Sequence, residues 1–589
     1  MLGRYIFERG EEKEMEFKGY PEYSSRQPLI LKYCLKRPVE TYPDDIGIVY
    51  RNDAGEYFRF TWRQWHERTC QQAHALKALG VKPGGPFEPG DRVGTMALNH
   101  HRHIENIWAS VLTGAVSHPI NMRLSMDHMA YTITHAEDKV IFFDDSILPL
   151  VEALYDRIKD TVKTFVYMSD KPGLPKTKVQ PLYEFEELIK QYPKTYDWPD
   201  FSEDTYAVLY YTTGTTGLPK GIMFTHRQVM LHVLYGFASM AFRVRRPDDP
   251  EPPNENIPMM NIPLFHIHAW GQPFSLVTAA SKIVFPGRFS PEAFCQMVQE
   301  DKVTSAGMVP TMLAMLLEYP DIDKYDLSSL IAIGTGGGAL PLGLKQKAEK
   351  KFPLMRAGSG YGMTETLAGV LGSTIRRNMV DWPQEKIDEI MVKTGVAGMG
   401  IQVRVVDENG KDVPHDNQAI GEIILRGHWI MERYFKEPER SATAWRDGWF
   451  HTGDAAKVDT DGYIIIADRI TDVIRSASEM VPTVLLENLT CNADFVLEAA
   501  YVGVPDEKWG EIPMALVKRV PGTKQTEEDI MKHLQTEGVD KGKITKWMLP
   551  SYVLFTDDIP RTSVGKFDKI AIRKRINEFV SKAKQVRKI

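Results

Sequence analysis

The sequence predicts an α/β protein with a large N-terminal domain of several parts and a small α+β C-terminal domain. The chain has 589 residues, and single hydrophobic cores stop growing at roughly 250–300 residues. Short β-like runs alternate with helix-period stretches over several hundred residues, which is typical of α/β layers with largely parallel sheets. From about residue 395 onward, strands are separated only by turns, which indicates a β-rich subdomain.

The elements of the N-terminal domain follow in order. Residues 1–45 lack clear periodicity and predict an extended arm with one helix near 28–37. After the arm, apolar β-like runs predict strands that form two layered α/β sheets, with amphipathic helices between them. The predicted strands are 46–50, 92–97, 139–143, 207–210 and 282–285, and the clearest helices are 62–79 and 291–301.

The β-rich part and the C-terminal domain come next. Strands are expected at 403–407, 421–426 and 462–466, divided by turns such as Glu408-Asn409-Gly410. A charged segment, 468–472, follows, and we predict the domain boundary there. The predicted domains are therefore 1–470 and 471–589, and the second is long enough for a small α+β fold.

Composition excludes several classes of protein. Hydrophobic residues make up 43% and charged residues 25%, as in an ordinary soluble globular protein. The formal charge is −6 without long blocks of one sign, so no nucleic-acid partner is expected. The four cysteines lie far apart and match no metal spacing, which fits a reducing compartment. Neither a signal core nor a transmembrane segment is evident, and a cytoplasmic location is predicted.

The most informative motif is a loop rich in Gly and Thr. It follows the apolar run 207–210 and reads Tyr211-Thr212-Thr213-Gly214-Thr215-Thr216-Gly217-Leu218-Pro219-Lys220-Gly221. Glycines allow close approach of the backbone to a ligand, and exposed N–H groups form an anion site. The spacing does not match a Walker A loop. The motif predicts a phosphate cradle; the alternative is a polar turn between a strand and the next element.

A second motif, Tyr361-Gly362-Met363-Thr364-Glu365-Thr366, places a carboxylate between hydroxyl groups. Oxygen donors of this kind suit Mg²⁺ bound alongside phosphates, so Glu365 is the candidate metal ligand. The alternative is an ordinary capped helix start, where Thr and Glu are common.

Two further motifs lie later in the chain. Asp454 closes a segment, 447–454, in which a carboxylate after a glycine turn could accept both hydroxyls of a ribose; an Asx turn is the alternative. Lys566 lies on a Gly-containing loop in Pro560-Arg561-Thr562-Ser563-Val564-Gly565-Lys566, and could bring a positive charge to a substrate. Taken alone, such a lysine is more often a solvent-exposed side chain.

These motifs, in this order, resemble the adenylate-forming superfamily: acyl- and aryl-CoA synthetases, peptide-synthetase adenylation domains and luciferases. The resemblance spans about residues 46–575. The segments 263–271 and 309–311 look most like the fatty-acyl-CoA synthetase branch. The resemblance implies two half-reactions. ATP and a carboxylate first give an acyl-adenylate and pyrophosphate. A thiol, usually that of coenzyme A, then displaces AMP. The implied cofactor and substrates are Mg²⁺, ATP, CoA and a small-molecule carboxylate.

The resemblance also implies a role for each motif residue. The Thr/Gly loop would hold the β- and γ-phosphates through Thr212, Thr213, Gly214, Thr215, Thr216 and Lys220. Thr364 would contact the α-phosphate, and Glu365 would bind Mg²⁺. Asp454 and Arg469 would bind the ribose, and Tyr361 would stack on adenine. Gly336, Gly337 and Gly338 would border adenine and the acyl pocket. Lys566, on a mobile C-terminal domain, would bridge the carboxylate and the α-phosphate.

Two positions bear on the acid. His266 matches an aromatic or histidine gate near the acyl and CoA channel, although a histidine packed in the core is the alternative. Gly362 stands where relatives restricted to acetate and propionate carry a tryptophan, so a carboxylate larger than propionate is expected.

The chain departs from the superfamily pattern beyond the predicted boundary. Thr471 stands at the hinge position, and Ala477-Ser478-Glu479 replaces the usual Gly-Gly-Glu. Side chains at 477 and 478 restrict the backbone and occupy space beside the expected pantetheine path. Three readings follow: an AMP-forming acyl-CoA ligase, which is favoured; a ligase that delivers the acyl group to a non-CoA acceptor; or a catalytically silent binding protein. A homodimer is also possible from the resemblance.

Overall fold

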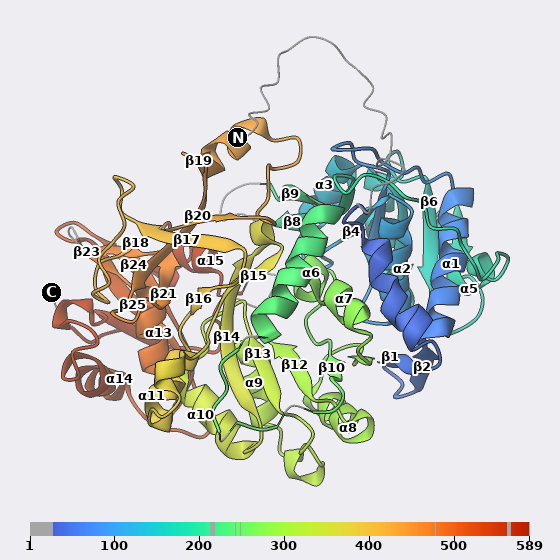
Figure 1. Cartoon of the computed structure of the whole chain (residues 1–589). Coiled ribbons are helices and arrows are strands. Elements are labelled where there is room, and N and C mark those ends of the chain that lie inside the picture. The colour runs from blue at the N-terminus through green and yellow to red at the C-terminus, as the bar shows by residue number, and fades with distance from the viewer. Residues whose placement is uncertain are drawn as a thin grey trace, which may run out of the picture.

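The computed structural model describes residues 27–212, 218–241, 243–247, 249–251, 253–476, 479–561 and 567–587. Within these residues the strands form four sheets, and helices cover and separate the first two (Figure 1). The predicted α/β class, with a large N-terminal domain of several sheets and a smaller C-terminal domain, is confirmed.

The first sheet carries the start of the phosphate motif. Its strands are β3 (Arg92–Met96), β4 (Val116–Pro119), β5 (Asp138–Asp144), β6 (Thr164–Met168), β7 (Leu182–Glu184), β8 (Tyr206–Thr212) and β9 (Lys220–Thr225). Their order is β7-β6-β5-β3-β4-β8-β9, parallel except for the antiparallel β8–β9 pair at one edge. The predicted strands at 92–97, 139–143 and 207–210 are all found here.

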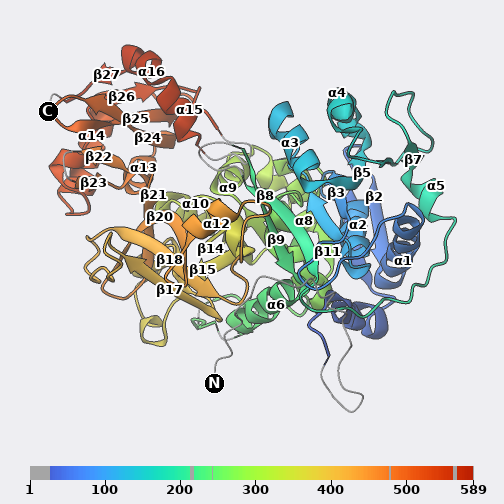
Figure 2. The ribbon, with the colours of Figure 1, turned by 90° about the horizontal axis from the view of Figure 1, so that it is seen from above.

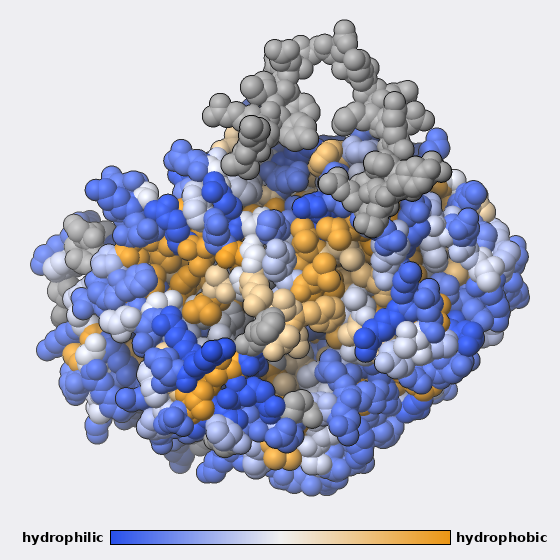
Figure 3. Space-filling view, in the orientation of Figure 1, coloured by the Kyte–Doolittle hydropathy of each residue, from blue (hydrophilic) through white to orange (hydrophobic). Residues whose placement is uncertain are grey.

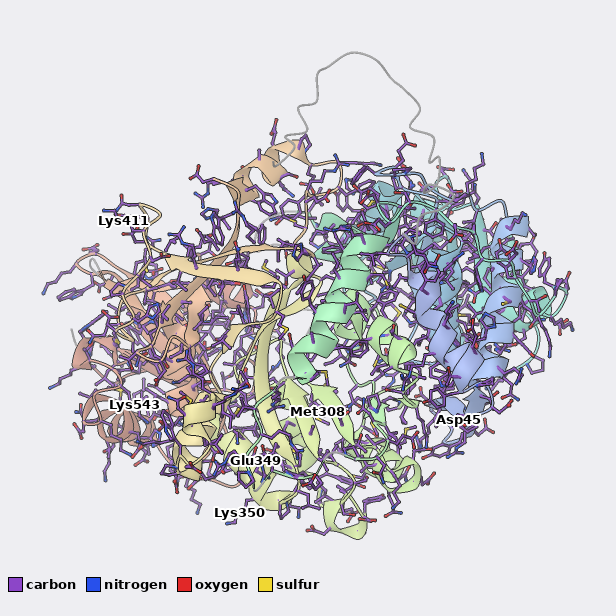
Figure 4. All side chains as sticks on the ribbon, in the orientation of Figure 1. Asp45, Met308, Glu349, Lys350, Lys411 and Lys543 are labelled. Atoms are coloured by element: carbon purple, nitrogen blue, oxygen red, sulfur yellow. The ribbon has the colours of Figure 1, made fainter. Side chains whose placement is uncertain are left out.

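The second sheet is also largely parallel. It contains β1 (Ile46–Arg51), β2 (Tyr57–Thr61), β10 (Pro258–Met259), β11 (Ile283–Phe285), β12 (Ser305–Met308), β13 (Ala332–Thr335), β14 (Arg356–Met363), β15 (Ala368–Gly372) and β16 (Val396–Ala397). Their order is β16-β15-β14-β13-β12-β10-β11-β1-β2, with antiparallel pairs at both ends. Met308 is fully buried in this sheet, whereas Lys350, Lys411 and Lys543 reach the outer surface (Figure 4).

The helices of the N-terminal domain are α1 (Trp62–Ala78), α2 (His101–Leu112), α3 (Met126–Ala136), α4 (Leu148–Ile158), α5 (Phe185–Ile189), α6 (His226–Ala241), α7 (Ile267–Ala279), α8 (Pro291–Asp301), α9 (Pro310–Leu317), α10 (Leu342–Lys351), α11 (Gln384–Met391) and α12 (Pro438–Ala444). One buried cluster includes residues of α1, α2, α6, α7 and both sheets, among them Trp62, Trp108, Phe224 and Phe274. The two sheets therefore share a core. On the surface, apolar side chains gather along α6, where Leu234 and Met240 are exposed (Figure 3).

The β-rich subdomain is an antiparallel sheet. It contains β17 (Ile401–Val406), β18 (Gly421–Gly427), β19 (Trp445–Arg446), β20 (Trp449–Val458) and β21 (Ile464–Arg469). The predicted strands at 403–407, 421–426 and 462–466 fall in β17, β18 and β21, and β20 was not anticipated.

The C-terminal sheet contains β22 (Ile474–Ser476), β23 (Glu479–Val481), β24 (Val496–Asp506), β25 (Gly510–Arg519), β26 (Tyr552–Phe555) and β27 (Lys584–Gln585). Its helices are α13 (Thr483–Cys491), α14 (Glu527–Leu534), α15 (Lys569–Lys574) and α16 (Ile576–Lys582). Figure 2 shows this unit set to one side of the larger sheets, with α13 beside β21. The chain changes sheets between Arg469 and Ile474; the boundary at 470/471 stays a prediction.

Two local predictions differ from the structure. The single helix expected near 28–37 is instead a 3₁₀ turn, Leu31–Leu35, followed by a π turn, Arg37–Thr41. Pro38 lacks the N–H donor that a continuous α-helix needs at this point. The turn expected before Asp454 is found at Asp447 and Gly448, which both have positive φ, but Asp454 itself lies inside β20.

Among the described residues, no helix combines the length and the apolar character that crossing a membrane would require.

Candidate active site

A cavity of about 1390 Å³ opens between the second sheet, the β-rich sheet and the C-terminal unit. It is lined by every predicted site residue that the structure describes: Thr212, Lys220, His266, Gly336, Gly337, Gly338, Tyr361, Gly362, Thr364, Glu365, Asp454 and Arg469. The remaining predicted residues, Thr213, Gly214, Thr215, Thr216 and Lys566, lie outside the described residues. Segments far apart in the sequence therefore converge on one site.

The phosphate motif sits on an antiparallel hairpin at the edge of the first sheet. Thr212 at the end of β8 pairs with Lys220 at the start of β9, so the two ends of the loop are held opposite each other. Val208 and Phe224, which pair further along the same strands, are fully buried. This core anchors the hairpin, and the residues at the two ends of its loop, Thr212 and Lys220, line the cavity.

The carboxylate motif forms a tight turn after β14. A 3₁₀ turn, η5 (Thr364–Thr366), follows the strand, and the Thr366 hydroxyl donates to the carbonyl of Ala368 at 2.6 Å while accepting from the Met363 N–H at 3.0 Å. Glu365 is 4% exposed but reaches the cavity wall. The available donors, a carboxylate and neighbouring hydroxyls, are those that a hard cation such as Mg²⁺ prefers.

Tyr434 connects the two motifs and was missed by the sequence reading. Its hydroxyl donates to Glu365 Oε1 at 3.0 Å, and Lys220 Nζ lies 3.4 Å from the same hydroxyl. Lys220 Nζ also lies 4.5 Å from the centre of the tyrosine ring. Burial and then the Glu365 carboxylate raise the pKa of Tyr434, which keeps the phenol protonated. Nothing in the local sequence Met431–Phe435 signals this contact.

Asp454 and Arg469 meet because their strands pair. The register of β20 and β21 sets Asp454 directly opposite Arg469, and Arg469 Nε lies 2.9 Å from Asp454 Oδ1. Tyr361, expected to stack on adenine, donates its hydroxyl to Asp454 Oδ2 at 2.5 Å. Burial acts to lower the pKa of Arg469, but the Asp454 carboxylate raises it overall. A carboxylate can accept about four hydrogen bonds, which is the chemistry that binding of ribose hydroxyls would need.

The opposite wall is built around an irregular turn. Residues from Ile267 to Gly271 all have φ between +45° and +73°, a short left-handed turn that costs roughly 1–2 kcal/mol per non-glycine residue. His266 precedes this turn and lines the cavity, as does Trp270. A Cβ on Gly336 would lie 3.1 Å from the Trp270 ring, so this glycine packs directly against the indole.

His268, two residues beyond the predicted gate, is the histidine that the core buries. Its ring lies between the hydroxyl of Tyr210, 2.8 Å from Nδ1, and that of Ser117, 3.2 Å from Nε2. Burial holds the pKa of His268 well below its usual value, so the ring is neutral. A histidine packed in the core was the alternative for His266. That description fits His268, whereas His266 is half-buried and lines the cavity.

The backbone of the β14–β15 hairpin leaves no room for a side chain at Gly362. A Cβ built there would lie 1.7 Å from the carbonyl oxygen of Ala368, inside the β14–β15 hairpin. Any side chain would force the hairpin apart, so this glycine is required whatever the size of the acid. The size of the acid must be argued from the cavity instead.

The C-terminal unit supplies one side of the cavity. Arg561 and Phe567, on either side of the segment that contains Lys566, both line it. Nearby, Lys569 at the start of α15 is 8% exposed and binds Asp468 of β21 at 2.8 Å and Glu487 of α13 at 2.9 Å. Burial acts to lower the pKa of Lys569, and the two carboxylates raise it overall. This buried ionic cluster joins the C-terminal unit to the strand that bears Arg469.

Comparison with known proteins identifies the family of this chain. The family model described as "AMP-binding enzyme" matches residues 35–435, and "AMP-binding enzyme C-terminal domain" matches residues 485–566. A long-chain-fatty-acid–CoA ligase from Thermus thermophilus is 36% identical, covering 90% of this chain and 93% of that protein. A 3-methylmercaptopropionyl-CoA ligase from Ruegeria lacuscaerulensis is 32% identical, covering 93% and 97%.

Solved structures share the fold. The anthranilate CoA ligase AuaEII, in complex with anthranoyl-AMP, superposes with a TM-score of 0.79 at 23% identity, covering 94% of this chain and 98% of that one. The amide bond synthetase McbA from Marinactinospora thermotolerans gives a TM-score of 0.75 at 22% identity, covering 93% and 100%. With the family models and the sequence relatives, the chain belongs to the AMP-binding enzyme family and is an acid–thiol ligase of the adenylate-forming superfamily.

Proposed function

We propose that this chain couples ATP cleavage to thioester formation: a carboxylate larger than propionate is adenylated with release of pyrophosphate, and CoA then displaces AMP. The convergence of Lys220, Glu365 and the Asp454–Arg469 pair in one cavity carries the proposal. A cation for phosphates, a carboxylate for a metal ion and an acceptor for ribose hydroxyls together match ATP.

The proposed roles follow from position. Lys220, Thr212 and the loop residues Thr213, Gly214, Thr215 and Thr216 hold the outer phosphates. Thr364 contacts the α-phosphate, Asp454 and Arg469 hold the ribose, and Tyr361 stacks on adenine beside the run Gly336, Gly337 and Gly338. Glu365 would hold Mg²⁺, which when bound would offset phosphate charge. Lys566 lies in the segment flanked by the cavity residues Arg561 and Phe567.

Chemistry in such a site consists of positioning and charge stabilisation, since the carboxylate substrate is itself the nucleophile. Lys566 would bring carboxylate and α-phosphate together as their charge redistributes, and Lys220 would stabilise the leaving pyrophosphate. His266 would line the path of the acyl group or of CoA. A serine or cysteine nucleophile is not needed.

The class of acid is a separate proposal. The relatives act, by their names, on long-chain fatty acids and on 3-methylmercaptopropionate, and both acids are larger than propionate. Trp270, Val309 and Pro310 are among the residues that line the cavity, so part of its wall is apolar. Medium-length, branched, cyclic and aromatic acids all fit this description. A homodimer and a cytoplasmic location remain predictions.

The test is acid-dependent exchange of pyrophosphate into ATP with a panel from acetate to long-chain and aromatic acids, followed by detection of acyl-CoA. We expect exchange with at least one acid larger than propionate and thioester formation with free CoA. Absence of exchange with every acid would favour a silent binding protein.

A non-CoA acceptor is the second candidate, and the replacement of Gly-Gly by Ala477-Ser478 favours it. Accumulation of acyl-AMP without acyl-CoA, and transfer to a carrier-protein thiol or an amine, would establish it. Restoring glycine at both positions should then raise the rate of thioester formation.

A further inference from the structure

Tyr434 links the lysine of the phosphate hairpin to the carboxylate proposed to bind metal. We propose that Tyr434 is a positioning residue that orients the Glu365 carboxylate for Mg²⁺ when magnesium–ATP binds. The proposal rests on the proposed function, because it assigns a further residue to the same nucleotide site. Neither the phosphate motif nor the carboxylate motif contains Tyr434, which lies more than sixty residues after the second of them.

The backbone around Tyr434 is joined to both motifs. The Met431 N–H donates to the carbonyl of Glu365 at 2.8 Å, and the Phe435 N–H donates to the carbonyl of Gly221 at 2.7 Å. Tyr434 itself bridges to Ile222 of β9. The segment Met431–Phe435 therefore ties the end of the phosphate hairpin to the turn that bears Glu365, with Tyr434 between the two attachments.

The side chain repeats this connection at the polar groups. Lys220 Nζ donates to the tyrosine hydroxyl at 3.4 Å, and the hydroxyl donates to Glu365 Oε1 at 3.0 Å. The tyrosine hydroxyl accepts a hydrogen bond from the lysine and donates one to the carboxylate, so each of the two hydrogen bonds polarises the other. The ammonium also lies 4.5 Å from the ring centre, within the range of a cation–π contact.

This arrangement has the form of an outer-shell contact to a metal ligand. A carboxylate that binds a cation is usually oriented by a hydrogen bond to one of its oxygens, and loss of such a partner typically weakens metal binding 10- to 100-fold. Glu365 and Tyr434 are each only 4% exposed, so water is a poor replacement for the missing partner. The hydroxyl, rather than the ring, is the part that acts on Glu365.

The ring has a structural role as well, since Tyr434 belongs to the large N-terminal core cluster. Tyr434→Phe keeps the ring and removes the hydroxyl. The matched control is Tyr501→Phe in β24, which removes a fully buried hydroxyl that bonds Thr490 at 2.8 Å, in the core of the C-terminal sheet. Tyr434→Phe removes two hydrogen bonds, one from Lys220 and one to Glu365, whereas Tyr501→Phe removes one, so the larger loss of melting temperature is expected for Tyr434→Phe.

The decisive measurement is calorimetric ATP binding with and without Mg²⁺, which needs no turnover. For Tyr434→Phe we expect metal-free ATP affinity within about twofold of wild type, and about tenfold weaker binding in the presence of Mg²⁺. The Mg²⁺ concentration that half-saturates this effect should rise by a similar factor. Tyr501→Phe should match wild type in both measurements.

A second variant checks that the effect passes through Glu365. Glu365→Gln should lose most of the Mg²⁺ dependence, and adding Tyr434→Phe to it should produce little further loss, because coupled residues are not additive. Additive losses would overturn the proposal.

Two results in the single variant would also overturn it. An unchanged Mg²⁺ dependence would mean that the hydroxyl does not orient the carboxylate, and an equal loss of affinity with and without metal would mean a purely structural role. If wild-type ATP binding shows no Mg²⁺ dependence at all, the metal part of the proposed function fails first and the inference with it.

Discussion

The cavity wall proposed to face the nucleotide and the contact between domains are built on opposite plans. On the wall, strand register and backbone hydrogen bonds place each polar group, as where β20 and β21 set Asp454 beside Arg469. At the domain contact, one buried lysine, Lys569, is held by carboxylates from β21 and α13. The first plan spreads the work over many backbone bonds, whereas the second depends on a few charged side chains. Substitutions should therefore act locally on the wall and more widely at the contact.

The largest effect is expected from Lys566→Ala, which separates the binding supplied by the wall from the chemistry supplied by the C-terminal domain. Removing one charge-stabilising group typically costs about 100- to 1000-fold in rate. Acid-dependent pyrophosphate exchange should fall by that factor, while calorimetric ATP binding stays near wild type. Lys582→Ala, on the exposed face of α16, is the control. Exchange at the wild-type rate in Lys566→Ala would remove the role given to this lysine.

Lys569→Met should disturb the domain contact next. Breaking a buried ion pair by removing one partner costs roughly 3–5 kcal/mol, and here two carboxylates lose their cation. We expect faster amide hydrogen exchange in α13 and β21. The affinity for ATP should change only slightly. The control is Lys584→Met, which removes an exposed ion pair with Glu528. This variant should leave amide hydrogen exchange in α13 and β21 unchanged. Equal behaviour of the two variants would show that the cluster does not hold the domains together.

Acid should weaken the N-terminal domain before the C-terminal one. Burial lowers the pKa of His103 to about 4, of His226 to about 3 and of His232 to about 4. Below about pH 6.5 the unfolded chain takes up protons that these native rings do not, so stability falls as the pH falls toward 4. At pH 5.5 each histidine should cost about 1 kcal/mol.

Hydrogen exchange at pH 7 and pH 5.5 checks this difference. Protection should fall more in α2 and α6 than in β24 and β25, because the C-terminal domain contains one histidine, His533. His232→Gln should reduce the acid sensitivity. Uniform loss of protection across both domains would contradict the assignment.

The smallest effect is expected from Asp454→Asn. The amide keeps one acceptor oxygen but loses the charge that pairs with Arg469, and a hydrogen bond to a charged group is worth roughly 1.5–3 kcal/mol. AMP affinity, measured by calorimetry, should fall about tenfold. Asp412→Asn, whose exposed carboxylate pairs with Arg404 at the β17–β18 turn, should not change AMP binding. Unchanged AMP affinity in Asp454→Asn would exclude its carboxylate from the ribose site.

Much of the fold was predictable because its signals are local. The apolar run 207–210 predicted β8, and the helical periodicity of 291–301 predicted α8, whose observed bounds, Pro291–Asp301, equal the expected ones. Pro38 broke the helix expected near 28–37, a signal that was present but overlooked. β20 was not predicted. Its first residue directly follows Asp447 and Gly448, and the segment was interpreted as a turn.

The site was predictable as a set of motifs but not as an arrangement. Neighbouring residues in the sequence form recognisable motifs around the Gly/Thr loop, Glu365 and Asp454. No such motif surrounds Tyr434, because its contact with Glu365 spans 69 positions of the chain. Gly362 shows the reverse case, where a residue interpreted as part of the acyl pocket is also required by the approach of the Ala368 carbonyl.

The sequence by itself determined the α/β class, the order of the domains and the types of group proposed to bind the nucleotide, since these depend on periodicity and on short motifs. Only the tertiary structure decided which groups touch: Tyr434 between Lys220 and Glu365, Tyr361 on Asp454, and Lys569 between two carboxylates. Such contacts depend on strand register and on the packing of distant segments, and these emerge only when the whole core has formed.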